Sequence, residues 1–369
     1  MEAHRTQGIL LKRTRISNLL FENPDIYKGF IPELLLELSD KSLNNVTGKT
    51  VEAGEIFETP PDTYENDEFT EIPSSNKLQI IPLTPLNREK TIAAIDVSSI
   101  RLGETEKGVL CSLRASLVWK ESMDYRYLRF GPLIFYLTSE ITKLFKIDYE
   151  KLPLILNPIF PINAQAIARL RNLLEREIQK AACNIFEDAN ILIDGSLTTG
   201  TPDNPTTQLE QILKQARKNN NTVLGISKAT KLFIRNKKIT EILDNYQGPC
   251  VLDLDKEIKT QFQTFPIRLL GKIYVAKLLS NGFAFRMDID EQISRNDQIK
   301  SINSLMGNDI IDQGYPETLR LAHILSSFTY NEILGIQSFL FQQYHIQIHH
   351  QQNIRRSLFG PFSTNKEVS

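Results

Sequence analysis

The sequence of 369 residues has only three cysteines, Cys111, Cys183 and Cys250, and no pair of them has the spacing of a zinc knuckle. An odd number of cysteines without paired spacing also argues against a disulfide framework and is typical of a reducing cytoplasm. No apolar stretch approaches the roughly eighteen residues of a membrane span, and the first twenty residues lack a signal-peptide core. We therefore expect a cytoplasmic protein that does not enter a membrane.

Excess charge is also missing, since 43 Lys and Arg residues face 44 Asp and Glu residues. A net charge of −1 gives no global field that would draw a polyanion, so nucleic acid would have to be held by a local patch. The hydrophobic fraction of 41% is that of an ordinary globular protein. The length suits one large domain with additions, or two domains.

The chain divides by composition into three parts. Residues 1–50 appear helical in pattern, and residues 51–87 are acidic and rich in Pro, Asn and Ser, which favours a linker. We therefore predict an N-terminal helical extension with an acidic linker over 1–87. The main domain follows over 88–345, and a C-terminal tail covers 346–369.

Hydrophobic periodicity in the main domain predicts strands alternating with helices, hence a mixed α/β sheet with helices on it and a helical C-terminal part. The expected strands are 91–97, 109–120, 125–133, 190–193, 223–227, and a hairpin of 273–279 and 283–289 that turns at Asn281-Gly282. The expected helices are 163–186, 208–218, a segment around 237–245, 317–328 and 332–344.

Two aspartates stand in matching contexts. Asp96 follows Ala93-Ala94-Ile95, and Asp194 follows Ile191-Leu192-Ile193, so that Ile-Asp-Val-Ser is echoed by Ile-Asp-Gly-Ser. An acid at the end of a buried strand points into the crevice where open α/β sheets bind ligands. The alternative is that each Asp only caps the following turn.

A third carboxylate is expected from the helix over 163–186. Its apolar stripe runs from Ile167 to Ile185, and Glu177 falls inside that stripe while Glu175 lies off it. A carboxylate on a buried face is costly unless it is paired or binds a metal, so we choose Glu177 as the helix acid. Glu175 remains the competitor, and Glu177 could equally reach water at the stripe edge.

These acids, if they converge, predict a divalent cation. Two like charges about 4 Å apart repel by about 4 kcal/mol at an effective dielectric of 20. Either the pKa values rise or a cation lies among the oxygens, and all-oxygen ligands favour Mg²⁺ or Mn²⁺ over zinc. Such a site suits in-line displacement at phosphate, in which one metal activates water and a second stabilises the leaving oxygen.

Other candidates surround this chemistry. His323, on the helix after Tyr315-Pro316, could be a manganese ligand, although a histidine on a polar flank is more often solvated. The segment from Lys228 to Lys238 holds Lys231 and Arg235 and no acid, which suits a groove that follows a nucleic-acid backbone or a solvated helix face.

Two further motifs imitate known sites without completing them. The run Val251-Leu252-Asp253-Leu254-Asp255 is similar to the nucleophile motif of haloacid-dehalogenase-like phosphatases, but Lys256-Glu257 follow where that family has Thr or Val. The tetrapeptide 47–50 is similar to the end of a P-loop, but position 43 is Leu43 instead of the first glycine. We therefore expect no ATPase site here.

Five blocks in order resemble the NurA nuclease domain over about 90–343. They are Ala94-Ile95-Asp96-x-Ser98, Leu192-Ile193-Asp194-Gly195-Ser196-Leu197, Gly225-Ile226-Ser227-Lys228, Phe285-Arg286-Met287-Asp288 and Tyr315-Pro316-x-x-Leu319-Arg320-x-Ala322-His323. The resemblance implies an RNase H-like fold, manganese-dependent 5′-to-3′ exonuclease and single-strand endonuclease activity, and a homodimer. It also implies work with a hexameric HerA-type ATPase in DNA end resection and double-strand break repair.

Carried onto matching positions, Asp96, Asp194 and His323 become metal-site residues, with Glu177 carried over less firmly. Lys228 and Tyr315 become catalytic neighbours around the phosphate. The candidate DNA contacts are Lys228, Lys231, Arg235, Arg286 and Arg320.

One departure is Val97, which stands where the family usually has Gly and which restricts the backbone after Asp96. This departure, together with the unmatched N-terminal part, motivates an alternative in which the chain is a catalytically weak DNA-binding adaptor of a translocating ATPase. A phosphatase using Asp253 is a third and weaker reading.

Overall fold

The computed structural model describes residues 30–53, 70–71, 78–139, 162–200, 205–254 and 268–350. Its centre is one mixed sheet that begins with a three-stranded antiparallel meander. The strands of the meander are β4 (Ile92–Thr105), β5 (Gly108–Glu121) and β6 (Asp124–Thr138). The predicted strands at 109–120 and 125–133 are thereby confirmed, and β4 runs well beyond the expected 91–97.

The sheet continues from the other edge of β4 through β7 (Asn190–Asp194) and β9 (Thr222–Ser227), both parallel to it. The order β6-β5-β4-β7-β9 is the RNase H-like arrangement that the resemblance implied. Next come β15 (Ala284–Asp290), β14 (Gly271–Lys277) and β12 (Cys250–Asp253), each antiparallel to its neighbour. The predicted hairpin is therefore present as β14 and β15.

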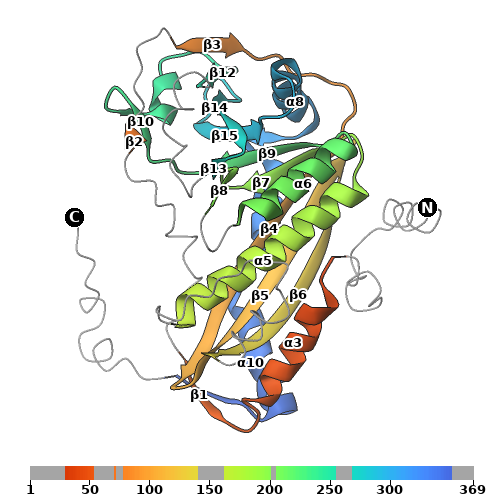
Figure 1. Ribbon diagram of the computed structural model, residues 1–369, viewed down its shortest axis with the longest axis vertical. Coiled ribbons are helices and arrows are strands. Elements are labelled where there is room, and N and C mark those ends of the chain that lie inside the picture. The colour runs from red at the N-terminus through yellow and green to blue at the C-terminus, as the bar shows by residue number, and fades with distance from the viewer. Residues whose placement is uncertain are drawn as a thin grey trace, which may run out of the picture.

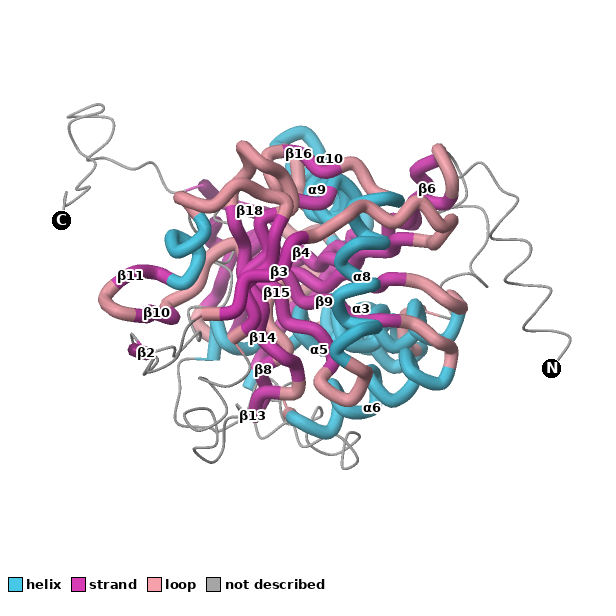
Figure 2. Tube along the Cα trace, turned by 90° about the horizontal axis from the view of Figure 1, so that it is seen from above, coloured by secondary structure: helices cyan, strands magenta, loops and turns pink. Residues whose placement is uncertain are grey.

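Helices cover both faces of this sheet because its strands alternate apolar side chains between two cores. On one face, Ala93, Ile95, Ile191 and Ile193 pack beneath α5 (Ile162–Ile185) and α6 (Thr206–Lys218). On the other face, Ala94, Leu192 and Leu224 pack against α8 (Arg295–Asn308) and α9 (Glu317–Ser326). Figure 1 shows α5 and α6 lying diagonally across the strands, and Figure 2 shows the strands between these helices and α9 with α10 (Tyr330–Tyr344).

The N-terminal helix α3 (Glu33–Asn44) packs onto the sheet on the face that α5 covers. It packs along β6, and its Leu35 and Leu38 join the core under α5. The stretch predicted as a linker contains three short strands in its described parts, β1 (Thr50–Ala53), β2 (Thr70–Glu71) and β3 (Gln79–Pro82), while residues 83–87 form neither helix nor strand. β1 pairs with β4 and β3 pairs with β12. β1 has a single buried side chain, Val51, which is too little to reveal a strand from the hydrophobic pattern.

The first described residues of the expected tail are also part of the sheet. They form β18 (Gln347–His350), which pairs in parallel with β1. Residues 1–29, the acidic stretch 54–69 and residues beyond 350 lie outside the described residues.

One predicted helix is wrong, and one helix was missed. The basic segment forms a hairpin of β10 (Leu232–Ile234) and β11 (Lys237–Lys238), and the helix expected around 237–245 is a short 3-10 turn, η1 (Ile239–Leu243). α8 was not anticipated, because polar Gln298, Ser301 and Ser304 occupy its buried face and interrupt the apolar period.

Short pairs of strands complete the described fold: β8 (Thr198–Thr199) with β13 (Arg268–Leu269), and β16 (Ile311–Asp312) with β17 (Tyr315–Pro316). None of the described helices has both the length and the apolar character that crossing a membrane requires.

Candidate metal centre and phosphate site

Asp96 and Asp194 lie side by side because β4 and β7 are parallel and in register. Ile95 pairs with Ile193, so the next residue on each strand is an aspartate at the same level. Both side chains point to the face that α9 covers, since side chains of a strand alternate. β7 ends at Asp194. Beyond that level, the edge of β4 that faced β7 has no partner among the described strands until Glu104, which pairs with β1. The echo of Ile-Asp in the sequence is therefore a structural equivalence.

α9 brings His323 to these two carboxylates. One potential ligand atom from each of Asp96, Asp194 and His323 lies within 4.8 Å of the others. Nδ1 of His323 is 3.3 Å from Oδ2 of Asp96, and 48% of the histidine side chain is exposed. The helix is fixed to the sheet because Ser116 Oγ donates to the carbonyl of Ala322 at 2.6 Å. The structure thus joins three of the four predicted metal-site residues.

A serine that the sequence analysis missed also contacts this group. Ser326 is fully buried, and its hydroxyl donates to Oδ2 of Asp96 and lies 2.9 Å from the hydroxyl of Ser98. Burial raises the pKa of Asp96, but hydrogen bonds from His323 and Ser326 outweigh it and leave the pKa lowered. The only sign of Ser326 in the sequence is its position three residues after His323, on the same side of the helix.

Lys228 and Tyr315 lie beside Asp194. Lys228 Nζ donates to Oδ2 of Asp194 at 2.7 Å and lies 5.8 Å from the centre of the Tyr315 ring. Burial raises the pKa of Asp194 even though Lys228 opposes the rise. The phenol oxygen of Tyr315 is buried without a hydrogen-bond partner among the described residues, and burial and the two aspartates raise its pKa.

On α5 the geometry favours Glu175 over Glu177. Burial raises the pKa of Glu175 to about 7, and the negative charges of Asp96 and Asp194 add to the rise. Neither acid belongs to the group of Asp96, Asp194 and His323, and both are half-buried on α5. α6 packs against α5, so the buried face of α5 extends beyond the apolar stripe, and the choice between the two acids stays a prediction. Gln179, outside that stripe, is fully buried and donates to Glu175 at 2.7 Å.

Arg286 does not face solvent, so its expected role as a DNA contact is wrong. Its side chain is 2% exposed, and it pairs with both carboxylate oxygens of Asp288 at 2.8 and 2.9 Å. Asp288 in turn accepts from the backbone N–H of Leu197 at 3.0 Å. The Arg286–Asp288 pair therefore fixes the loop that follows Asp194.

That loop also depends on two glycines. Gly195 has φ +111°, which an L side chain rarely adopts, and a Cβ at Gly225 would lie 2.7 Å from the carbonyl oxygen of Gly195. The Gly-Ile-Ser-Lys block therefore has two roles. Gly225 lets the backbones of β9 and the Gly195 loop come close together, and Lys228 supplies its amine.

The remaining predicted DNA contacts are on the surface. Lys231 and Arg235 are exposed on the β10–β11 hairpin, with Arg235 at φ +52° in its turn. Arg320 is exposed on α9 and bonded to Glu317 at 2.6 Å. Their positions allow contact with a polyanion, and such contact stays a prediction.

Val97 does not disturb the site. β4 continues through it without a turn, and its side chain packs into the core on the α5 face, 6% exposed. The backbone that Val97 restricts is therefore an extended strand, and no turn follows Asp96.

Asp253 belongs to a buried group of ion pairs. It is buried and bonded to Lys272 Nζ at 3.1 Å and to Arg295 at 2.8 Å. Two cations already neutralise this carboxylate, and it lies on β12, four strands from β7 in the sheet. The phosphatase interpretation has no support from this arrangement.

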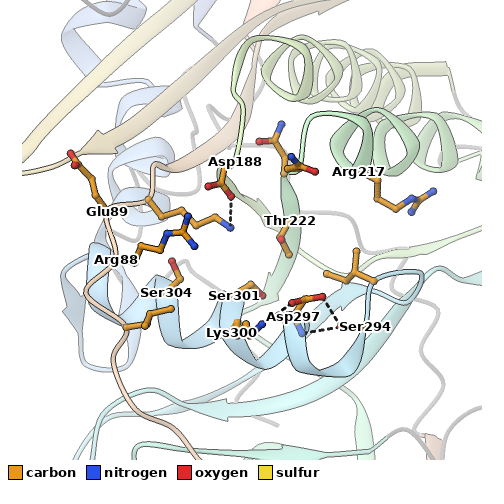
Figure 3. Close-up of a pocket in the computed structure, with 15 residues that line it drawn as sticks. Arg88, Glu89, Asp188, Arg217, Thr222, Ser294, Asp297, Lys300, Ser301 and Ser304 are labelled. Carbon is orange, nitrogen blue, oxygen red and sulfur yellow. Dashed lines mark hydrogen bonds and ion pairs between the residues drawn. The ribbon is translucent and has the colours of Figure 1, made fainter.

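A cavity of about 420 Å³ lies at the opposite end of the sheet (Figure 3). It is lined by Lys90, Asp188 and Thr222, at the amino ends of β4, β7 and β9, and by residues of α8. Lys90 pairs with Asp188 at 3.4 Å and Lys300 with Asp297 at 3.3 Å. It is distinct from the aspartate site at the carboxyl end of β7.

The donors of the aspartate site fit a divalent cation. Two carboxylates and an imidazole are ligands that Mn²⁺ accepts. Burial raises the pKa values of Asp194 and Glu175, and the charge of Asp96 adds to both rises, so a bound cation would offset part of the cost of ionising these carboxylates. The unpartnered Tyr315 hydroxyl leaves a donor for a further bound group.

Comparison with known proteins gives a family match. The family model of the NurA domain matches residues 90–328. The search of curated proteins gave no match. Among solved structures, the NurA nuclease from Sulfolobus solfataricus is 16% identical with a TM-score of 0.44, over 71% of this chain and 87% of that one.

Two further structures are similar at the same level. A crystal structure of NurA is 10% identical with a TM-score of 0.42, over 75% of this chain and 91% of that one. Endonuclease V from Streptomyces avermitilis is 11% identical with a TM-score of 0.36, over 70% and 86%. Because these TM-scores are low, the assignment rests on the family model, which spans more than half of the sequence and includes the two aspartates, Lys228, Tyr315 and His323. The chain belongs to the NurA domain family.

Proposed function

We propose that the protein is a metal-dependent DNA nuclease that hydrolyses phosphodiester bonds at the Asp96–Asp194 site. The observation that carries the proposal is the convergence of Asp96, Asp194 and His323 within 4.8 Å, with the amine of Lys228 bonded to Asp194. An acidic cluster beside an exposed cation can hold both a divalent cation and the phosphate that it acts on.

Asp96 and Asp194 would hold the cation, with His323 assisting and Glu175 as the helix carboxylate. Asp96 suits this role because Ser326 and His323 both bond to its Oδ2, which leaves Oδ1 for a ligand bond. His323 approaches Asp96 through Nδ1 and would assist by fixing the orientation of this carboxylate. In the two-metal form of this chemistry, bound cations activate water and stabilise the leaving oxygen.

The chain's own groups would position the phosphate. The Lys228 side chain is 45% exposed, so its ammonium can exchange the Asp194 contact for a phosphate oxygen while staying over the Tyr315 ring. The buried hydroxyl of Tyr315 has no acceptor among the described residues and is available to donate to the same phosphate group. Lys228 would then offset the negative charge of the phosphate, and Tyr315 would fix the orientation of the phosphate.

The finer assignments rest on the family resemblance. We propose that Mn²⁺ or Mg²⁺ is the cofactor, that the enzyme is a 5′-to-3′ exonuclease and single-strand endonuclease, and that 88–345 forms the catalytic unit. As a cytoplasmic homodimer it would work with a hexameric HerA-type ATPase in end resection during double-strand break repair. The three buried free thiols agree with a reducing compartment.

The test is cleavage of end-labelled single-stranded and duplex DNA with and without Mn²⁺. We expect shortening of the DNA only with the cation, and loss of cleavage in Asp194→Ala with an unchanged circular dichroism spectrum. Asp124→Ala is the control, because its carboxylate is exposed at the β5–β6 turn, away from the site. Full activity of Asp194→Ala would refute the site.

The same assay separates the adaptor alternative. An adaptor would change the DNA-stimulated turnover of the ATPase without shortening DNA at any cation concentration. The regular course of β4 through Val97 removes one motive for that alternative.

A further inference from the structure

The β14–β15 turn carries an exposed aromatic side chain at the same end of the sheet as the metal centre. Met287 of β15 is level with Ile226 of β9, which is level with Asp194 of β7. The turn over 278–283 therefore projects past the carboxyl end of β7. At usual strand dimensions, Phe283 is roughly 13 Å further along and roughly 10 Å across from Asp194.

Phe283 is 66% exposed, although its backbone is held firmly. Its N–H donates to the carbonyl of Gln313 at 2.8 Å. A Cβ at Gly282 would lie 2.9 Å from the N atom of Gly314, and one at Gly314 would lie 2.4 Å from the Phe283 carbonyl oxygen. The two loops interlock through glycines, so Phe283 is presented to solvent from a rigid support.

This support is continuous with the phosphate site. Gly314 directly precedes Tyr315, whose ring packs against Phe285 with 5.3 Å between ring centres. Lys228 lies over the same Tyr315 ring and bonds to Asp194. Phe283 therefore lies within reach, over a few nucleotides, of a strand whose phosphate is at Lys228.

The two interlocked loops and their flanks carry other exposed apolar side chains, beside the exposed polar Ser280, Asn281 and Gln313. Leu279 of the same turn is 38% exposed, and Ile310, which leads into β16 and the loop before Tyr315, is 55% exposed. Tyr246, 48% exposed, is at the base of the turn, where its carbonyl accepts from Lys277 at 3.0 Å. Base faces are apolar, and every nucleobase can stack on an aromatic ring irrespective of sequence.

We propose that Phe283 is a stacking platform for an unpaired nucleobase of the DNA strand that enters the site. This inference rests on the proposed function, because it takes DNA as the ligand. It adds a subsite that recognises bases without sequence preference and that prefers single-stranded over paired DNA, since paired bases already stack on their neighbours.

The experiment measures binding of a fluorescent oligothymidylate to the full chain in EDTA, beside an abasic oligonucleotide of equal length and charge. Phe283→Ala should weaken oligothymidylate binding about 5- to 150-fold and leave abasic binding unchanged. Phe283→Trp should retain binding. Met123→Ala is the control, because Met123 is 87% exposed in the β5–β6 turn at the opposite end of the sheet.

Phe283→Trp offers a second signal. Trp119 is the sole native tryptophan and is 4% exposed, so an added surface indole would report stacking by quenching with oligothymidylate and not with the abasic strand. Equal loss of binding to both oligonucleotides in Phe283→Ala, or no loss to either, would overturn the proposal. Cleavage with Mn²⁺ is scored in parallel: cleavage without base-dependent binding refutes only the stacking subsite, and base-dependent binding without cleavage refutes only the nuclease.

Discussion

Replacing Glu175 by Gln should raise the free energy of unfolding above neutral pH, because it removes a buried ionised carboxylate near the metal centre. The rise of its pKa from an ordinary 4.5 to about 7, caused first by burial, corresponds to at most about 3 kcal/mol. Because the folded-state pKa is raised, the ionised form opposes folding. Stability should therefore be highest when Glu175 is protonated and should fall as pH rises from about 4.5 through 7.

Glu175→Gln removes that loss and keeps the Oε1 acceptor that Gln179 uses. We expect the variant to match the wild type at pH 4.5 and to exceed its free energy of unfolding by up to about 3 kcal/mol at pH 8 in EDTA. Urea denaturation at both pH values measures this. With Mn²⁺ the wild type should be the more stable of the two proteins, because a bound cation stabilises the folded state and the variant lacks the carboxylate proposed to help bind it.

Glu177→Gln is the matched control on the same helix, and it should change the free energy of unfolding by no more than about 0.5 kcal/mol at either pH. If Glu175→Gln shows no gain at pH 8, or if Glu177→Gln shows the same gain, the account of the helix acid is wrong.

Two other predictions concern the arginine and lysine residues. Arg286→Ala should lower the free energy of unfolding by about 3–5 kcal/mol, because it leaves buried Asp288 without its partner, while exposed Arg320→Ala should change stability little. Thermal unfolding tests this, and equal stability of the two variants would contradict it. Replacing Lys231 and Arg235 together should flatten the salt dependence of single-strand binding by about 0.7 in slope for each lost phosphate contact. An unchanged slope would mean that these exposed side chains do not contact the backbone.

The sequence was sufficient to predict the central strands and the pair of aspartates. Ile95 and Ile193 each end an apolar run before an acid, and parallel pairing makes these positions equivalent. His323, Lys228 and Tyr315 were identified through family resemblance, and the structure gathers them around the same carboxylates.

The errors have a common physical cause, because burial depends on partners that are distant in sequence. Gln179, outside the apolar stripe of α5, is fully buried in a helix that α6 packs against, and Arg286 is buried where Asp288 and Thr198 bond to it. β1 and β18 pair with each other across almost three hundred residues, and neither carries a strong pattern of its own. Local periodicity contains no information about such neighbours.

The most direct test of the metal centre is a crystal structure of the protein grown with Mn²⁺, with anomalous differences recorded at the manganese edge. We predict a peak within bonding distance of the carboxyl oxygens of both Asp96 and Asp194, which disappears in Asp194→Asn. A peak that contacts neither aspartate, or none at saturating Mn²⁺, would contradict the account.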